Sequence, residues 1–141
     1  MEYLHRLLYK MQLDPGFKHH NRCKAVHLTH ISFADDVLMF SRGDIVSVQM
    51  VMKVMQTFSQ STGLVVNPRK CRIFFGGVDL DTKMRLKSVT TFQEGEMPFK
   101  YLGVPMTSRR LDLHHYMPLI DKIVGRITHW SSKLLSYAEK I

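Results

Sequence analysis

The chain has 141 residues, 45% of them hydrophobic, which is enough for one domain with an ordinary core. Twenty lysines and arginines against twelve acidic residues give a formal net charge of +8, which favours a polyanionic partner such as a nucleic acid. No apolar run of eighteen residues and no signal-peptide core occur, so we expect neither a membrane-spanning nor a secreted protein. The two cysteines, Cys23 and Cys71, form no CxxC pair, and a reducing intracellular compartment is therefore the default.

The first element is predicted from apolar residues at helical spacing, which indicate an amphipathic helix from Met1 to about Met11. No Ser, Thr, Asp or Asn precedes this helix to bond its free amide groups, which is typical of a chain that begins within a helix. Asp14-Pro15-Gly16 then predicts a turn.

A strand, a tight turn and a second strand are predicted next. The β-prone run His27–Ser32 precedes Phe33-Ala34-Asp35-Asp36, and the apolar run Val37–Phe40 follows. A continuous apolar run is typical of a strand that is buried on both faces. The segment therefore predicts a β-hairpin with two adjacent carboxylates, Asp35 and Asp36, at its tip.

The paired carboxylates suit Mg²⁺, which prefers oxygen ligands and is usually held by one or two carboxylates plus substrate phosphates. Two such ions would stabilise the attacking and leaving oxygens of a phosphoryl or nucleotidyl transfer. The alternative is a polar hairpin turn, since Asp is a favoured turn residue. Two charges beside the apolar run Val37–Phe40 are costly without a compensating cation, which favours the metal site.

Two helices and a short strand are predicted in the middle of the chain. Asp44 is placed to cap a helix that starts at Ile45 and that Gly63 is placed to end. Ile73-Phe74-Phe75 predicts a short buried strand, and a helix is predicted from Asp81 to about Thr91.

The last third of the chain predicts a hairpin and a helical end. Tyr101–Val104 is predicted to be a short strand, one half of a hairpin with the residues after it. From Ile120 the apolar spacing predicts one or two helices, with Pro118 in the first turn and a break near Ser131-Ser132. Together these elements predict an α+β fold.

Three segments resemble motifs of one protein family. His30–Phe40 resembles the catalytic hairpin of reverse transcriptases, specifically those of plant LINE-type non-LTR retrotransposons. Thr62–Cys71 resembles the next palm motif of that family, and Phe99–Pro105 resembles its primer-grip motif. The three segments occur in the family's order, and the resemblance covers essentially the whole chain.

The resemblance implies a partial polymerase palm in residues 1–106, with an antiparallel catalytic hairpin packed on helices, and the start of a helical thumb in residues 107–141. It implies an RNA-directed DNA polymerase that joins nucleotides to a primer 3′ end with two Mg²⁺ ions. RNA template, DNA primer and deoxynucleoside triphosphates are the implied partners.

Residue by residue, the resemblance implies that Asp35 and Asp36 are catalytic metal ligands and that Phe33 lies beside the primer end. Lys70 is the third implied catalytic residue, near the incoming triphosphate, with a solvated surface lysine as the alternative. The remaining implied primer-binding residues are Tyr101, Leu102 and Gly103, although Gly103 also fits an ordinary turn glycine.

The sequence also departs from the family. The family's metal site needs a third aspartate and its substrates are gripped by fingers, and nothing before Phe33 supplies either. Asp14 has none of the surrounding motif. Positioning and electrostatic stabilisation supply most of the rate in phosphoryl transfer, so we expect this chain alone to be inactive and the missing fingers and palm segment to be a partner.

Two further hypotheses come from other classes of protein. One is a non-catalytic fragment that binds nucleic acid through its basic surface. The other is a small zinc-stabilised module, because five potential ligands fall within twelve residues: His19, His20, Cys23, His27 and His30. The alternative for those five is that they pack on or cover the hairpin.

Overall fold

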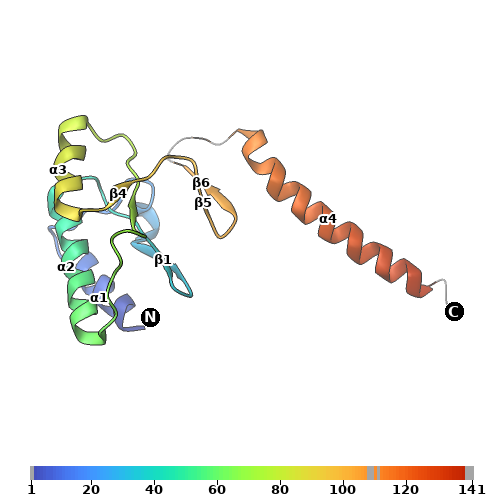
Figure 1. The fold of residues 1–141 in the computed structure, drawn as a ribbon, viewed down its shortest axis with the longest axis horizontal. Coiled ribbons are helices and arrows are strands. Elements are labelled where there is room, and N and C mark those ends of the chain that lie inside the picture. The colour runs from blue at the N-terminus through green and yellow to red at the C-terminus, as the bar shows by residue number, and fades with distance from the viewer. Residues whose placement is uncertain (1, 108–109, 111, 139–141) are drawn as a thin grey trace. The chain divides into compact units, whose positions relative to one another are not determined.

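The computed structural model describes residues 2–107, 110 and 112–138, and of residues 132–138 the backbone alone (Figure 1). The chain divides into two compact units, Met1–Gly95 and Glu96–Ile141. Helices and short hairpins alternate in it, which confirms the predicted α+β class and is consistent with a partial polymerase palm.

Three α-helices build the first unit: α1 (Glu2–Gln12), α2 (Ile45–Thr62) and α3 (Leu80–Thr90). Helix α1 packs on α2, and α2 packs on α3. The apolar side chains of α1 recur every three or four residues, so one face of the helix is buried. That face joins two later aromatic side chains in one cluster, the core cluster, which consists of Leu4, Leu8, Met11, Phe17 and Phe58.

The helix ends follow the predicted capping pattern. The Asp44 side chain accepts a hydrogen bond from the Ser47 amide at 2.9 Å, and Gly63 ends α2 in the left-handed conformation with φ of 73°. Asp79 caps α3 in the same way, and the hydrogen bond from the Thr82 amide lowers the pKa of its carboxyl group. Helix α3 therefore begins one residue before the predicted start.

The β-structure of the first unit consists of two short pairs of strands. Strands β1 (His30–Phe33) and β2 (Asp36–Met39) form the antiparallel hairpin that the sequence predicts. Strand β3 (Arg72–Ile73) pairs in parallel with β4 (Gln93–Glu94). The prediction of a buried strand over Ile73–Phe75 is wrong in its bounds and its burial: it overlaps β3 at Ile73 alone, and neither residue of β3 is buried, because β4 offers β3 a partner only at Arg72 and Ile73.

The expected burial of the second hairpin strand on both faces is wrong. All residues of the apolar run Val37–Phe40 are only half-buried. Val37 and Met39, which share one face of β2, pack against the core cluster. Leu38 lies on the opposite face, is not among the side chains packed against that cluster, and is half-buried too, so only one face of β2 is supported by the core cluster.

The second unit contains strands β5 (Phe99–Tyr101) and β6 (Val104–Met106) and helix α4 (Leu113–Ala138). The two strands pair in antiparallel fashion around a turn of Leu102 and Gly103. The predicted hairpin is present, but the predicted strand Tyr101–Val104 is wrong because it spans the turn.

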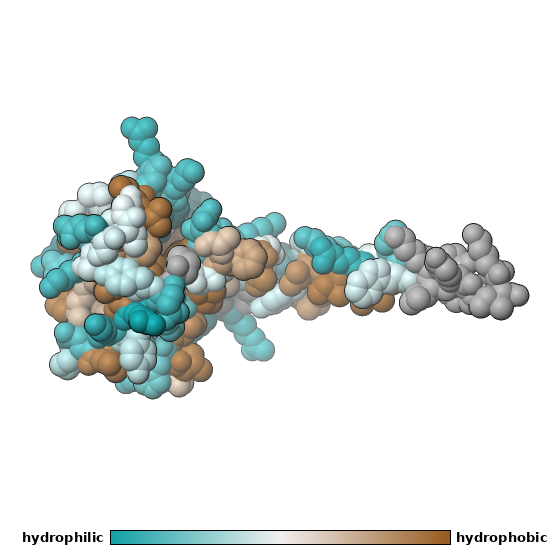
Figure 2. All heavy atoms as spheres, turned by 90° about the horizontal axis from the view of Figure 1, so that it is seen from below, coloured by the Kyte–Doolittle hydropathy of each residue, from teal (hydrophilic) through white to brown (hydrophobic). Residues whose placement is uncertain are grey.

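Helix α4 differs from its prediction at the start and in the middle. It begins at Leu113, so Pro118 lies inside the helix, where it lacks the amide that would bond one turn back. No break occurs at Ser131, whose hydroxyl donates a hydrogen bond to the Thr128 carbonyl at 2.9 Å and so fits the helix. Apolar side chains lie exposed along α4 (Figure 2): Tyr116, Met117, Ile120, Ile123, Val124, Ile127 and Trp130.

Among the described helices, none combines the length and the hydropathy that crossing a bilayer requires.

The core cluster should dominate the stability of the first unit. Leu8 is 1% exposed, so Leu8→Ala should lower the free energy of unfolding by about 2–5 kcal/mol through lost burial and the cavity left behind. Leu13→Ala is the matched control, because Leu13 is 67% exposed and its change should stay within about 0.5 kcal/mol. Urea unfolding followed by circular dichroism measures both, and equal losses would contradict the position assigned to the core.

Candidate active-site hairpin and primer-grip turn

The first candidate site is the tip of the β1–β2 hairpin. Ala34 and Asp35 form the turn between the paired residues Phe33 and Asp36. Ala34 has φ of 48°, in the left-handed region that non-glycine residues rarely adopt. The Phe33 ring is 61% exposed, and both carboxylates are exposed as well. The tip thus presents one aromatic ring and two acidic groups to solvent, at the end of the hairpin that the sequence predicts.

The base of the hairpin is held to the helices. Beyond the strand ladder, the Phe40 amide donates a hydrogen bond to the Thr29 carbonyl at 2.8 Å. On the first strand, a ring nitrogen of His30 lies 3.3 Å from a ring nitrogen of His5 in α1, and burial lowers the pKa of His30. The exposed tip therefore projects from a packed and hydrogen-bonded base.

The donor set at the tip fits the expected metal. Two adjacent carboxylates offer hard oxygen ligands, and Mg²⁺ commonly takes one or two of these and completes its octahedron with water and phosphate oxygens. Within the described part of the chain, neither Asp35 nor Asp36 forms an ion pair, so both remain open to a cation. No third His, Cys, Asp or Glu side chain of the described residues joins them in a potential metal-binding group.

Lys70 lies in a turn that Asn67 organises. The Asn67 side-chain oxygen accepts a hydrogen bond from the Arg69 amide at 3.0 Å, and its carbonyl accepts one from the Lys70 amide at 3.0 Å. Lys70 is exposed, and in the described residues no ion pair or hydrogen bond connects it to the carboxylates of the hairpin. This geometry leaves both interpretations of Lys70 open.

The second candidate site is the β5–β6 turn, which belongs to the second unit. Leu102 and Gly103 occupy its two central positions with φ of 52° and 83°, the pattern of a tight hairpin turn whose twist matches the strands. Glycine adopts this conformation freely, whereas leucine does not. A Cβ added at Gly103 would meet no atom within 4 Å, so the conformation and not the protein's own packing demands glycine here.

Leu102 is the less expected of the two turn residues. This residue is 54% exposed, so its apolar side chain contributes little to the packing of the protein. A strained backbone with an exposed apolar side chain is commonly found where a segment contacts a ligand. Tyr101 precedes it at the end of β5 and is half-buried.

The five residues of the zinc hypothesis meet only in pairs. The His20 Nδ1 atom lies 3.9 Å from the Cys23 sulfur, and the His19 and His27 rings pack edge to face at 5.4 Å. His30 faces His5 of α1. In the described residues these five form no group of three convergent ligand atoms, so the structure gives no support to that module.

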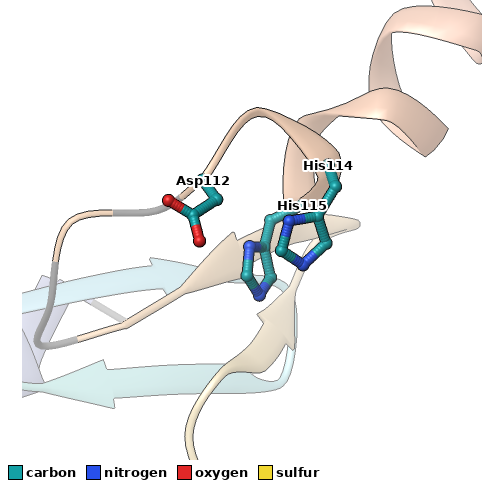
Figure 3. Close-up of side chains that lie close together, drawn as sticks. All are labelled: Asp112, His114 and His115. Carbon is teal, nitrogen blue, oxygen red and sulfur yellow. The ribbon is translucent and has the colours of Figure 1, made fainter.

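One convergent group lies where the sequence analysis assigned no ligand. Asp112, His114 and His115, at the start of α4, each offer a ligand atom within 4.8 Å of the others (Figure 3). The run Asp-Leu-His-His was the available signal in the sequence, because three potential ligands stand within four residues.

Comparison with known protein families identifies the family to which the chain belongs. The α+β arrangement, with an acidic hairpin on a helical core and a second hairpin after it, is consistent with part of a polymerase palm. The family described as reverse transcriptase (RNA-dependent DNA polymerase) matches residues 6–106, more than half of the chain, and the chain belongs to this family. The matched range includes the hairpin, Lys70 and the β5–β6 turn. No solved structure matches the chain.

Glycine-to-alanine substitution should have opposite effects on stability in the β5–β6 turn and in the interior of helix α4. Gly103→Ala should destabilise the β5–β6 hairpin by about 1–2 kcal/mol, because alanine must adopt φ near 83°. Gly125→Ala, in the open interior of α4, should instead stabilise its helix by about 1 kcal/mol. Hydrogen exchange at the Tyr101 and Val104 amides reports the first effect, and helicity by circular dichroism reports the second. Unchanged exchange in Gly103→Ala would refute the assigned turn.

Proposed function

We propose that this chain provides the carboxylate hairpin and the primer-contacting turn of an intracellular RNA-directed DNA polymerase of the plant LINE-type non-LTR kind. The observation that carries the proposal is the hairpin tip itself. Two exposed, adjacent carboxylates project from a base that packs on the core cluster, inside the range that matches the reverse transcriptase family.

In this proposal Asp35 and Asp36 hold Mg²⁺ through their carboxylate oxygens. When bound, the metal supplies stabilisation of the negative charge that develops on the attacking and leaving oxygens. The hairpin contributes positioning, because its paired strands fix the two acidic groups at one end of β1 and β2. The exposed ring of Phe33 is placed on the same turn, where it can lie against the nucleotide at the primer end.

The other assigned residues act on the phosphates and on the primer. Lys70 lies in an open turn, from which its ammonium group can neutralise the triphosphate or give a proton to departing pyrophosphate. Leu102 and Gly103 form a narrow turn tip with no neighbouring side chain over the glycine, which leaves the backbone accessible to a primer strand. Tyr101 begins that turn.

The site in the described residues has two of the carboxylates that the chemistry needs. The segment that supplies the third aspartate and the fingers is therefore a necessary partner of the reaction, alongside RNA template, DNA primer and deoxynucleoside triphosphates. Without that segment neither metal geometry nor substrate alignment is complete, and alignment is a major source of rate.

Primer extension tests the assignment of activity. The chain alone should extend an RNA-templated DNA primer no faster than a protein-free control with Mg²⁺ present, because its metal site is incomplete. The prediction of inactivity would be overturned if the chain alone extended the primer, if Asp35→Asn abolished this extension, and if Asp81→Asn in α3 left it intact.

Metal binding tests the assignment of ligands independently of activity. Nuclear magnetic resonance (NMR) gives the measurement. Mn²⁺, a paramagnetic substitute for Mg²⁺, should broaden the amide NMR signals of residues 33–37, and Asp35→Asn or Asp36→Asn should weaken that broadening. Asp81→Asn is the matched control, since Asp81 is also an exposed aspartate but lies on α3. Equal broadening in wild type and in Asp35→Asn would remove Asp35 as a ligand.

The alternative function is nucleic-acid binding without catalysis, which the net charge of +8 favours. Affinity for a primer–template duplex should fall steeply as salt rises, and Lys70→Ala should reduce the slope of log K against log salt by about 1 if Lys70 contacts a phosphate. Fluorescence anisotropy at several salt concentrations measures this. Lys53→Ala, an exposed lysine on α2, is the control, and identical slopes for the two variants would exclude the contact.

A further inference from the structure

The start of α4 carries a side-chain cluster that the polymerase reaction does not use. Asp112 is the residue before the helix, and His114 and His115 belong to its first turn. The His115 amide donates a hydrogen bond to the Asp112 carbonyl at 3.1 Å, which fixes the spacing of the two residues. Figure 3 shows the carboxylate and the two rings side by side.

The two imidazoles are unusually close. Their ring centroids lie 3.8 Å apart with the planes tilted by 40°. The Nδ1 atom of His115 is buried and has no hydrogen-bond partner among the described residues. Buried polar atoms nearly always have a partner, and a bound metal ion would give this nitrogen one.

We propose that Asp112, His114 and His115 bind one Zn²⁺ ion at the start of α4. Two neutral imidazole nitrogens and one carboxylate oxygen form a three-ligand set that zinc accepts, with water in the fourth position. This site is independent of the proposed polymerase function.

The distances allow zinc to bind with small adjustments. Zinc bonds to nitrogen and oxygen are about 2.0–2.2 Å long, so two ligand atoms of a tetrahedral site stand about 3.3 Å apart. The three ligand atoms already lie within 4.8 Å of one another. Rotations about the side-chain bonds of Asp112 and His114, which are both exposed, can close this gap without moving the backbone.

The electrostatics also decide which ligands are needed. A helix N-terminus disfavours a cation, because the first amide groups carry positive partial charge. The negative charge of Asp112 offsets that effect, so the two histidines without the aspartate would bind much more weakly. The bound ion would tie Asp112 to the first turn of α4 and so hold the start of the helix.

The site differs chemically from the acidic hairpin. Mg²⁺ prefers oxygen ligands, whereas imidazole nitrogen favours zinc and its neighbours in the periodic table. Asp35 and Asp36 provide oxygen only. The chain therefore has one site of each type, and the two can be told apart by the choice of metal.

Zinc titration of the full chain against a chromophoric chelator is the test. Wild type should bind one equivalent at this cluster, and His114→Ala, His115→Ala and Asp112→Asn should each weaken binding at least about 10-fold. Helicity without zinc should be equal in wild type and Asp112→Asn, because asparagine also caps helices well.

A matched control separates this cluster from the other histidines and cysteines. The double substitution His20→Ala and Cys23→Ser removes a close His–Cys pair outside the cluster and should leave the affinity for zinc unchanged. Co²⁺ bound to wild type should give the strong visible absorption of a four-coordinate site, and Asp112→Asn should reduce it. Failure to bind one equivalent, unchanged affinity in the histidine variants, or loss of binding in the control would each overturn the proposal.

Discussion

Packing of α1 against α2 is the interaction on which the functional part of the first unit depends. The buried faces of these helices meet in the core cluster, and Val37 and Met39 of the hairpin rest on it. A two-stranded hairpin by itself is only marginally stable in water, so its tip would not be held in one position without such a support. The apolar contacts of the helices thus determine how firmly Asp35 and Asp36 are positioned.

Each of the two antiparallel hairpins has one non-glycine residue in the left-handed region of its turn. Ala34 and Leu102 have φ of 48° and 52°, which costs a non-glycine residue about 1–2 kcal/mol. Strand pairing on either side of each turn compensates for this strain. The two turns also carry the residues to which the reverse transcriptase motifs assign metal and primer contacts, which fits the general association of backbone strain with ligand-binding sites.

The positive charges that favour a nucleic acid and the acidic groups proposed to bind metal are carried by different residues. The excess of eight positive charges favours a polyanion overall, while the hairpin tip is locally acidic and needs a cation before a phosphate can approach it. At the start of α4, two imidazole rings stand beside a single carboxylate. The two proposed metal sites therefore differ in their donor atoms.

The sequence alone determined the elements whose signals are local. The caps Asp44 and Gly63 and the hairpin around Asp35 lie where predicted, because capping and turn formation depend on neighbouring residues. Only the tertiary structure decided how far β2 is buried and that β3 pairs with β4, since both depend on which distant segments become neighbours. The start of α4 before Pro118 escaped prediction because a single proline disfavours a helix interior without forbidding it.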